Sequence, residues 1–221
     1  MFTSVRNHSP GINEEYIAEK KQDYQAMCEE SVKNGFKKPL GIGTLIFDEV
    51  KVIGKVLLNM KNEKFSGLAM SVEEMCNLHD LYQDLDSSEP VPAEYMLQFL
   101  WRDFTSHFDV IGPFYSFDST IDSKIVIETL FETMRVFRNH GFKTIAVVCD
   151  GASSNMAAIK LLTTGKRGAF GFSDDNSKKH AVEPWFKNPF APDLDVFCII
   201  CPSHQVGTVD HFKFGRVRYI S

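Results

Sequence analysis

The sequence contains no apolar run that approaches the roughly 18 residues of a membrane-spanning helix, so no transmembrane segment is predicted. It also has no surplus of basic residues: 24 Lys and Arg stand against 29 Asp and Glu, a formal net charge of −5. Neutralisation of phosphates by Lys and Arg supplies most of the affinity of nucleic-acid-binding proteins. The charge balance therefore argues against a chain that binds DNA unaided, and it leaves room for an acidic active site within a larger DNA-handling protein.

Signals of several other protein classes are missing as well. No GxxxxGK[ST] or GxGxxG motif is present, which weakens a nucleotide-binding function. No secretory signal opens the chain and the number of cysteines, five, is odd, so a reducing intracellular compartment is expected. Cys198 and Cys201 form a single CxxC within an apolar strand, where alternation places them on opposite faces, and this argues against a zinc site.

The composition that remains is typical of a globular protein, with 43% apolar and 24% charged residues. Nineteen phenylalanines predict a core rich in aromatic packing. The length of 221 residues suits one or two domains.

Apolar periodicity divides the first half of the chain into a helix and several strands. Residues 13–34 are free of Gly and Pro and carry a broken apolar stripe at helical spacing, which predicts a surface helix ahead of the core. Residues 35–39 break this helix. Short turns separate the strand-like runs that follow, which predicts an antiparallel meander; the runs are 40–47, 50–60 and 65–70.

The second half alternates helices with strands. Residues 122–140 form the clearest helix, with one apolar face and Gly141 at the position of a C-cap glycine. Residues 144–149 predict a buried strand, and the helix–strand–turn–helix order around it is typical of an α/β crossover with parallel strands. The other expected segments are a helix after a capping box at 71–74, a strand or short helix at 95–104, a helix at 156–162, a loop at 165–188 and a buried strand at 196–201.

Two aspartates stand at the ends of buried strands in this pattern. Asp48 follows the run 40–47, and Asp150 follows the run 144–149. Each of them alone also fits a turn or helix-capping role. If the two strands are adjacent and parallel, however, both side chains emerge at the same carboxyl edge, on strands about 4.8 Å apart. Carboxylates so placed can share or bridge Mg²⁺ or Mn²⁺ for phosphodiester chemistry. Asp48 and Asp150 are therefore the predicted catalytic and metal-binding residues.

The sequence around both aspartates resembles a known family. GIGTLIFDEVKV, followed about a hundred residues later by GFKTIAVVCDGASSN, is similar to the P element-type transposases, including the THAP-containing ones. The likeness extends from about Gly35 to Gln205. It implies an α/β RNase H-like fold in which a mixed sheet, an antiparallel meander of three strands plus parallel strands, is flanked by helices. It also implies a Mg²⁺- or Mn²⁺-dependent core that cleaves and joins DNA at transposon ends in the nucleus, with homo-oligomers as an option and no membrane partner.

The resemblance further implies a third acid, usually Glu, beyond an inserted helical domain that follows the fifth strand. After ICPSHQ this sequence reads VGTVDHFKFGRVRYIS, which departs from the family pattern, and no THAP-type zinc array precedes residue 35. The expected organisation is an N-terminal tail and helix at 1–34, a partial RNase H-like domain at 35–205 that is incomplete at its C-terminus, and an atypical tail at 206–221. With two of three acids, the chain is expected to be inactive alone.

Several further residues could contribute to the site, and other functions are also compatible with the sequence. His204, after the expected fifth strand, and Asn155, within CDGASSN, are candidate accessory residues. Lys160 and the basic residues of the following loop fit either a DNA-backbone contact or a solvated face. One alternative function is a domesticated or decayed RNase H-like module that binds nucleic acid or protein without catalysis. A weaker one is nucleotide or phosphate binding at the turn after Asp150.

Overall fold

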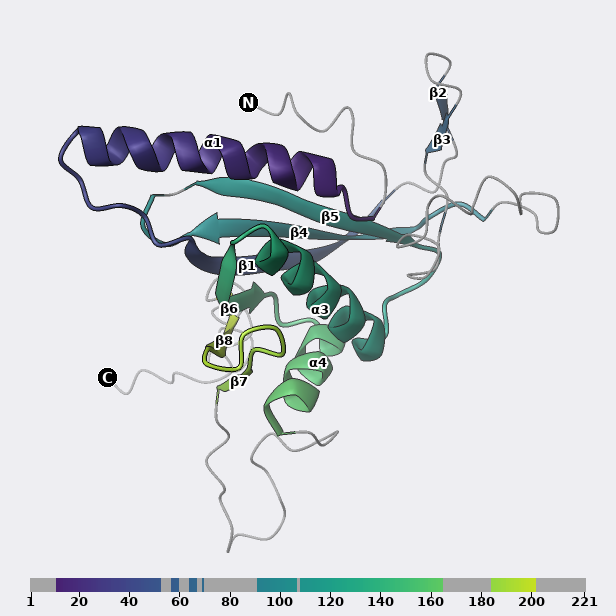
Figure 1. Cartoon of the computed structure of the whole chain (residues 1–221). Coiled ribbons are helices and arrows are strands. Elements are labelled where there is room, and N and C mark those ends of the chain that lie inside the picture. The colour runs from purple at the N-terminus through teal and green to yellow at the C-terminus, as the bar shows by residue number, and fades with distance from the viewer. Residues whose placement is uncertain are drawn as a thin grey trace, which may run out of the picture.

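A computed structural model of the chain describes residues 11–52, 57–59, 64–66, 69, 91–106, 108–164 and 184–201. A six-stranded mixed sheet with the strand order β5-β4-β1-β6-β8-β7 runs through its centre (Figure 1). The described elements, in chain order, are α1 (Glu14–Lys33), β1 (Ile42–Lys51), β2 (Leu57–Asn59), β3 (Lys64–Ser66), β4 (Tyr95–Asp103), β5 (Asp109–Phe117), α3 (Ser123–Asn139), β6 (Lys143–Cys149), α4 (Ser153–Thr164), β7 (Trp185–Lys187) and β8 (Asp195–Ile200).

Strand β1 divides the sheet into an antiparallel and a parallel half. On one side β1 pairs antiparallel with β4, which pairs antiparallel with β5. On the other side β1 is parallel to β6, and β6 is parallel to β8, while β7 forms an antiparallel edge. The predicted fold class, a mixed α/β sheet of RNase H-like type with a three-stranded antiparallel part, is confirmed.

The strands of that antiparallel part differ from the ones that the sequence pattern predicted. The run 40–47 does not turn at Asp48 and Glu49, because β1 continues to Lys51 and pairs with β4 along its whole length, from Gly43↔Asp103 to Lys51↔Tyr95. The expected second strand is divided: its first residues end β1, and β2 pairs with β3 in a separate two-stranded sheet. The segment left open as strand or helix at 95–104 is β4, the true partner of β1.

Two further predictions need correction near the C-terminus. The expected loop at 165–188 contains β7, which pairs with β8. Strand β8 is only half-buried, because Phe197 and Ile199 are 48% and 41% exposed on the sheet face opposite the described helices. The helix expected after the capping box at 71–74 and the candidate residue His204 lie outside the described residues.

The helices expected at 13–34, 122–140 and 156–162 are confirmed as α1, α3 and α4, and the ends of α1 and α3 have clear local causes. The Asn13 side chain accepts a hydrogen bond from the Tyr16 backbone N–H (2.9 Å) and so caps α1. Asp122 accepts from the Lys124 backbone N–H (2.6 Å) and caps α3 in the same way. Helix α3 ends where Gly141 adopts a positive φ of 83°, as its predicted C-cap role requires. Within the described ranges, no helix combines the length and apolarity needed to cross a membrane.

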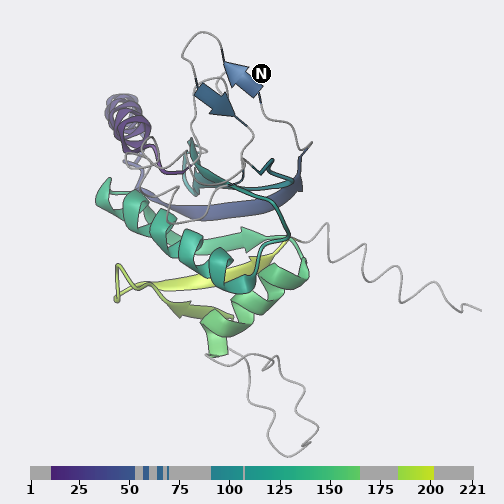
Figure 2. The same ribbon diagram turned by 90° about the vertical axis from the view of Figure 1, so that its right-hand side faces the viewer.

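The helices pack on one face of the sheet through an aromatic cluster. The Tyr24 ring of α1 lies edge-on to Trp101 and Phe142, with centroid distances of 6.4 and 5.6 Å. The same Trp101 ring stacks on Phe137 of α3 at 6.4 Å, so α1 and α3 cover the same face. Helix α4 lies beside α3 (Figures 1 and 2). The segment expected as a surface helix ahead of the core thus contributes to that core through its buried residues Ile17, Tyr24 and Cys28.

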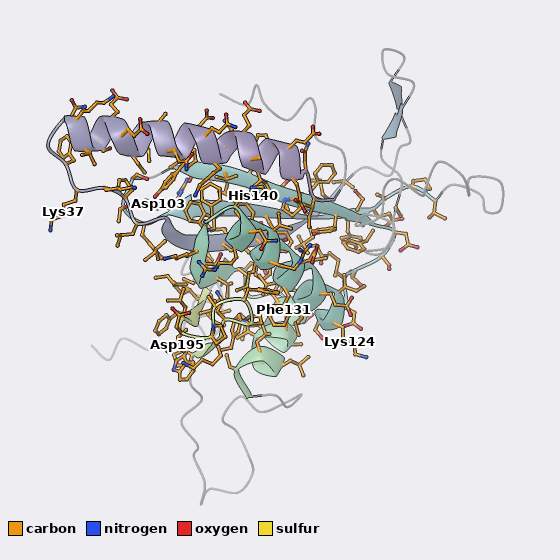
Figure 3. All side chains as sticks on the ribbon, in the orientation of Figure 1. Lys37, Asp103, Lys124, Phe131, His140 and Asp195 are labelled. Atoms are coloured by element: carbon orange, nitrogen blue, oxygen red, sulfur yellow. The ribbon has the colours of Figure 1, made fainter. Side chains whose placement is uncertain are left out.

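A buried carboxylate ties the three segments that meet beneath α1. Asp103, at the end of β4, is 1% exposed and accepts a hydrogen bond from the Tyr24 hydroxyl at 3.0 Å (Figure 3). It also accepts from the backbone N–H and hydroxyl groups of Thr105 and Ser106. The Tyr24 hydroxyl accepts in turn from the Gly41 N–H at 2.8 Å. The network anchors α1 to the start of β1 and the end of β4.

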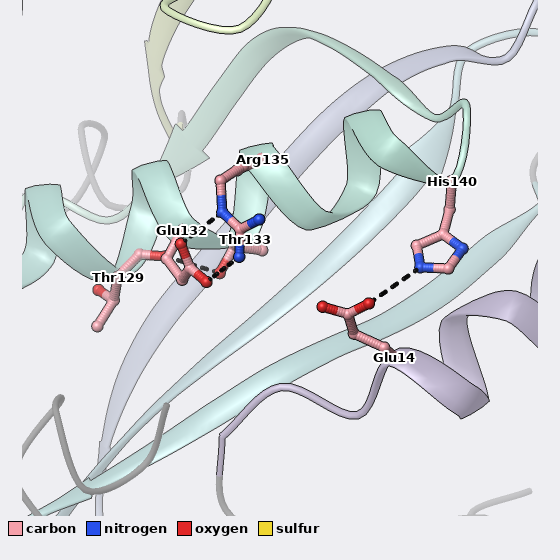
Figure 4. A network of polar contacts seen from close by, with 6 residues as sticks. All are labelled: Glu14, Thr129, Glu132, Thr133, Arg135 and His140. Atoms are coloured by element: carbon pink, nitrogen blue, oxygen red, sulfur yellow. Dashed lines mark hydrogen bonds and ion pairs between the residues drawn. The ribbon is translucent and has the colours of Figure 1, made fainter. Parts of the chain in front are cut away.

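Polar contacts on α3 are of two kinds. The hydroxyls of Thr129 and Thr133, both fully buried, donate to backbone carbonyls one turn earlier, which satisfies them inside the core. Nearer the surface, Arg135 and Glu132 form a bidentate pair, and the His140 ring approaches the Glu14 carboxylate of α1 at 3.9 Å (Figure 4). The last contact links the two helices only weakly, because the Glu14 side chain is 61% exposed.

Candidate active site

Both predicted aspartates lie just beyond the point where the parallel pairing of β1 with β6 ends. The parallel register pairs Leu45 with Val147 and Ile46 with Val148. Asp48 and Asp150 each lie two residues beyond the last of these pairs. Paired residues of parallel strands point to the same face and side chains alternate along each strand, so the register gives the two aspartates equivalent positions.

Asp48 stands at the point where β1 loses its parallel neighbour. Strand β6 ends at Cys149, whereas β1 continues and still pairs with β4, so that Asp48 lies opposite Gln98. The Asp48 side chain is exposed, as a position beyond the end of a neighbouring strand allows. The prediction that Asp48 directly follows a strand is therefore wrong, because β1 runs on to Lys51. Asp48 does lie beyond the part of β1 that pairs with β6.

Asp150 is held by the turn that leads into α4. Its Oδ1 atom accepts a hydrogen bond from the Ala152 backbone N–H at 3.0 Å and another from the Asn155 side-chain Nδ2 at 2.7 Å. Asn155 lies in the first turn of α4 and is 1% exposed. The motif CDGASSN thus combines a strand end, a tight turn and a buried amide that meets the strand-end carboxylate.

The electrostatics of this edge are acidic. Burial raises the pKa of Glu49, a hydrogen bond with the Ile121 backbone partly offsets this, and the charges of Asp150 and Asp48 raise it further. The thiol of Cys149 has its pKa raised to about 12, chiefly by burial and then by Asp150, with a smaller contribution from Asp48. The charges of the two aspartates thus raise the pKa of both Glu49 and Cys149. The negative potential that they create at this edge favours binding of a cation.

The donor chemistry fits a hard divalent cation, but the ligand set is incomplete. Two carboxylates are the ligands that Mg²⁺ and Mn²⁺ prefer. Across the residues that the structure describes, no group of three or more His, Cys, Asp or Glu side chains is arranged to hold a metal ion. A divalent ion held by Asp48 and Asp150 would need at least one further ligand.

The remaining candidate residues, a downstream acid and a cysteine of the CxxC lie in different places. Asn155 contacts Asp150, as described above, whereas His204 is outside the described residues. Asp195, a downstream acid, lies at the opposite end of the sheet and pairs with Lys187 at 2.7 Å. Cys198 is half-buried in β8, and burial raises its pKa to about 12. Glu49 was missed as a neighbour of the site, although it follows Asp48 directly in the sequence.

Comparison with known families identifies the family to which the chain belongs. A family model described as TNP-like, RNase H N-terminal domain, matches residues 8–163. The chain belongs to this family. The resemblance to the RNase H-like domain of P element-type transposases, seen in the sequence around both aspartates, is thereby confirmed. A search of curated protein sequences gives no match.

The TNP-like RNase H domain also resembles solved structures. The Drosophila P element transposase strand transfer complex is similar with a TM-score of 0.51 and 14% sequence identity, over 94% of this chain and 46% of that chain. At this identity the likeness shows a shared fold. The chain spans about half of that transposase. The Mos1 strand transfer complex (TM-score 0.26, 11% identity, 71% of this chain and 42% of that one) and the mariner Mos1 paired end complex with Mg (0.23, 13%, 71% and 42%) are too distant to support an argument.

Proposed function

We propose that this chain is part of the catalytic core of a DNA transposase, which cleaves and joins phosphodiester bonds with divalent metal ions held by Asp48 and Asp150. The register of β1 and β6 carries the proposal, because it gives these two carboxylates equivalent positions at one sheet edge. The proposed substrate is DNA at transposon ends, since the chain belongs to a transposase-type family and its fold is shared with a P element transposase strand transfer complex.

Each residue of the edge has a proposed part. Asp48 and Asp150 offer carboxylate oxygens to Mg²⁺ or Mn²⁺, and Asp150 also accepts hydrogen bonds from the Ala152 N–H and the Asn155 amide. When bound, a divalent ion at this edge would neutralise phosphate charge and activate the attacking oxygen. Glu49 lies within the field of the two aspartates, whose charges add to the effect of burial and raise its pKa.

We propose, in addition, that the 221-residue chain does not cleave DNA unaided. The described residues contain no three-ligand group, and in-line phosphoryl transfer needs its ions held in a fixed geometry. The same observation supports the second candidate function, a decayed or domesticated RNase H-like module that binds nucleic acid or protein without catalysis. For the intact protein we propose the nucleus as its location and assembly as a homo-oligomer on DNA.

A thermal melt with and without millimolar Mn²⁺ or Mg²⁺ tests the metal site. A ligand present at about 100 times its Kd stabilises a protein by about 2.7 kcal/mol, and about 1 kcal/mol moves the melting temperature of a chain of this size by about 2–4 °C. We expect an increase of several degrees for the native chain and none for Asp48→Ala combined with Asp150→Ala. Asp193→Ala, which removes an exposed acid elsewhere, serves as the control and should keep the increase. An equal increase in the double variant counts against the site.

A strand-cleavage assay with Mn²⁺, on DNA that carries transposon ends, tests the proposed inactivity. We expect no cleavage by the 221-residue chain. Cleavage that disappears in Asp150→Ala would show that an acid within this chain completes the site, and the inactivity would then be the wrong part of the proposal.

A further inference from the structure

We infer that Asn155 is a positioning residue for Asp150: its buried amide holds one carboxylate oxygen and leaves the other to face a bound cation. This rests on the proposed metal site and deepens it. Asn155 is the only buried polar residue of α4 among those described, and it is 1% exposed. Its Nδ2 atom lies 2.7 Å from Asp150 Oδ1.

The burial of Asn155 needs a reason, because an unpaired amide in the core is destabilising. The fold of the turn supplies the partner: α4 begins at Ser153, so that Asn155 in its first turn comes back beneath the end of β6. The short, charge-assisted bond to Asp150 satisfies one amide hydrogen. An apolar side chain at this position would fill the space and leave the carboxylate without this donor.

Both donors in the turn reach the same oxygen of Asp150. The Ala152 N–H at 3.0 Å and the Asn155 amide at 2.7 Å occupy the two lone pairs of Oδ1. Two donors on one oxygen fix the plane of the carboxylate, and Oδ2 is the oxygen left to coordinate an ion. Orientation of a ligating carboxylate by such hydrogen bonds commonly accounts for a 10–100-fold difference in metal affinity.

A purely structural role for Asn155 makes a different prediction. The Ala152 N–H alone closes a turn onto Asp150, and a residue that only secured this turn would change stability and not the affinity of the folded protein for metal. The distinction is measurable in the metal-free protein, whose melting temperature in EDTA reports the fold, and in a Mn²⁺ titration of the folded protein.

The experiment measures the Mn²⁺ Kd of the full chain by electron paramagnetic resonance of the free ion. We expect Asn155→Ala and the better space-filling Asn155→Leu to bind about 10-fold or more weakly, in line with the effect of lost carboxylate orientation. Gly151→Ala is the matched control, because it lies in the same turn and a Cβ there would meet nothing within 4 Å. Substitutions at such open surface positions have small effects, so the Kd of this variant should stay within about 2-fold of the native value.

The Asp150→Ala background separates the outcomes. A residue that acts through Asp150 has no further effect once Asp150 is gone, so Asn155→Ala should leave the residual affinity of Asp150→Ala unchanged. Native Mn²⁺ affinity in folded Asn155→Ala and Asn155→Leu, with loss in Asp150→Ala, overturns the role of Asn155 and leaves the metal site standing. Native affinity in Asp150→Ala overturns the metal site and this inference with it. Failure of both Asn155 variants to fold in EDTA assigns Asn155 a structural role and also overturns the inference.

Discussion

Removal of the Tyr24 hydroxyl probes how α1 is attached to the sheet. In Tyr24→Phe the aromatic contacts with Trp101 and Phe142 remain, but two hydrogen bonds are lost. One is donated to the buried Asp103 carboxylate at 3.0 Å, and the other is accepted from the Gly41 N–H at 2.8 Å. The phenol is 5% exposed and Asp103 is 1% exposed, so water does not freely take the place of the lost hydroxyl at the Asp103 carboxylate.

The size of the effect follows from these two bonds. A hydrogen bond to a charged group contributes about 1.5–3 kcal/mol, and a buried N–H left without an acceptor costs about 1–3 kcal/mol. A surface groove lined by Tyr24, Cys28 and Gly41 lets water approach the N–H and reduces the second contribution. We therefore expect Tyr24→Phe to lower the free energy of unfolding by about 2–4 kcal/mol, a large part of the 5–15 kcal/mol typical of a domain.

Equilibrium unfolding in urea, followed by the fluorescence of the buried Trp101, measures this change. Tyr95→Phe, at a half-buried position of the same sheet, is the control and should change the free energy by less than about 0.5 kcal/mol. A double-mutant cycle with Asp103→Asn should give a coupling energy of about 1–2 kcal/mol. A loss below about 0.5 kcal/mol for Tyr24→Phe, or strict additivity in the cycle, would refute the hydrogen-bond argument.

Three other perturbations have expected outcomes. Gly43→Ala should strongly lower the melting temperature or prevent folding, since a Cβ at this glycine would clash with the fully buried Trp101 ring and with the backbone of β4; a native melt would contradict the tight packing. Burial raises the pKa of Asp103, but its hydrogen bonds lower it more, to a net value below the ordinary 3.8. The charged form of Asp103 therefore stabilises the fold above the ordinary pKa, and this contribution is lost as the pH falls through the lowered pKa. In melts between about pH 7 and 2.5, the melting temperature of Asp103→Asn should fall less steeply at the acid end than that of the native chain. Glu14→Gln should change stability by less than about 0.5 kcal/mol in the same melts, because its contact with His140 is long and exposed.

Local sequence signals predicted helices α1, α3 and α4 and the parallel strands well. Helix α3 has a capping aspartate, a complete apolar face and a C-cap glycine, and each of these acts within a few residues of the chain. Strand β6 is short, apolar and bounded by Gly141 and the turn after Asp150. Where such near neighbours determine the structure, the sequence alone is sufficient.

The antiparallel strands could not be assigned in this way. The residues after Asp48 alternate as those of a second strand would. Strand β1 continues through them because β4, about 50 residues later, pairs with it up to Lys51, and no neighbouring residue in the sequence indicates this pairing. The parallel pairing of the strands that carry Asp48 and precede Asp150 was predictable, because the two apolar runs occur in the order of a crossover. The bond between Asn155 and Asp150 was not, since it depends on the rotation of α4 about its axis, which the packing of α4 against α3 determines.

The central position of β1 has a consequence for how the protein is made. Its antiparallel partner is about 50 residues away along the chain and its parallel partner about 100 residues away. At synthesis rates of about 5–20 residues per second, β1 leaves the ribosome on the order of 5–20 s before β6 does. During that interval Leu45 and Phe47, both buried in the finished sheet, have no β6 to pack beside. Such distant pairings also make folding slow, because the entropy of closing the long loops is lost before the strand contacts form and offset it. The strand that carries Asp48 is thus among the first parts of the sheet to be synthesised and among the last to be completed.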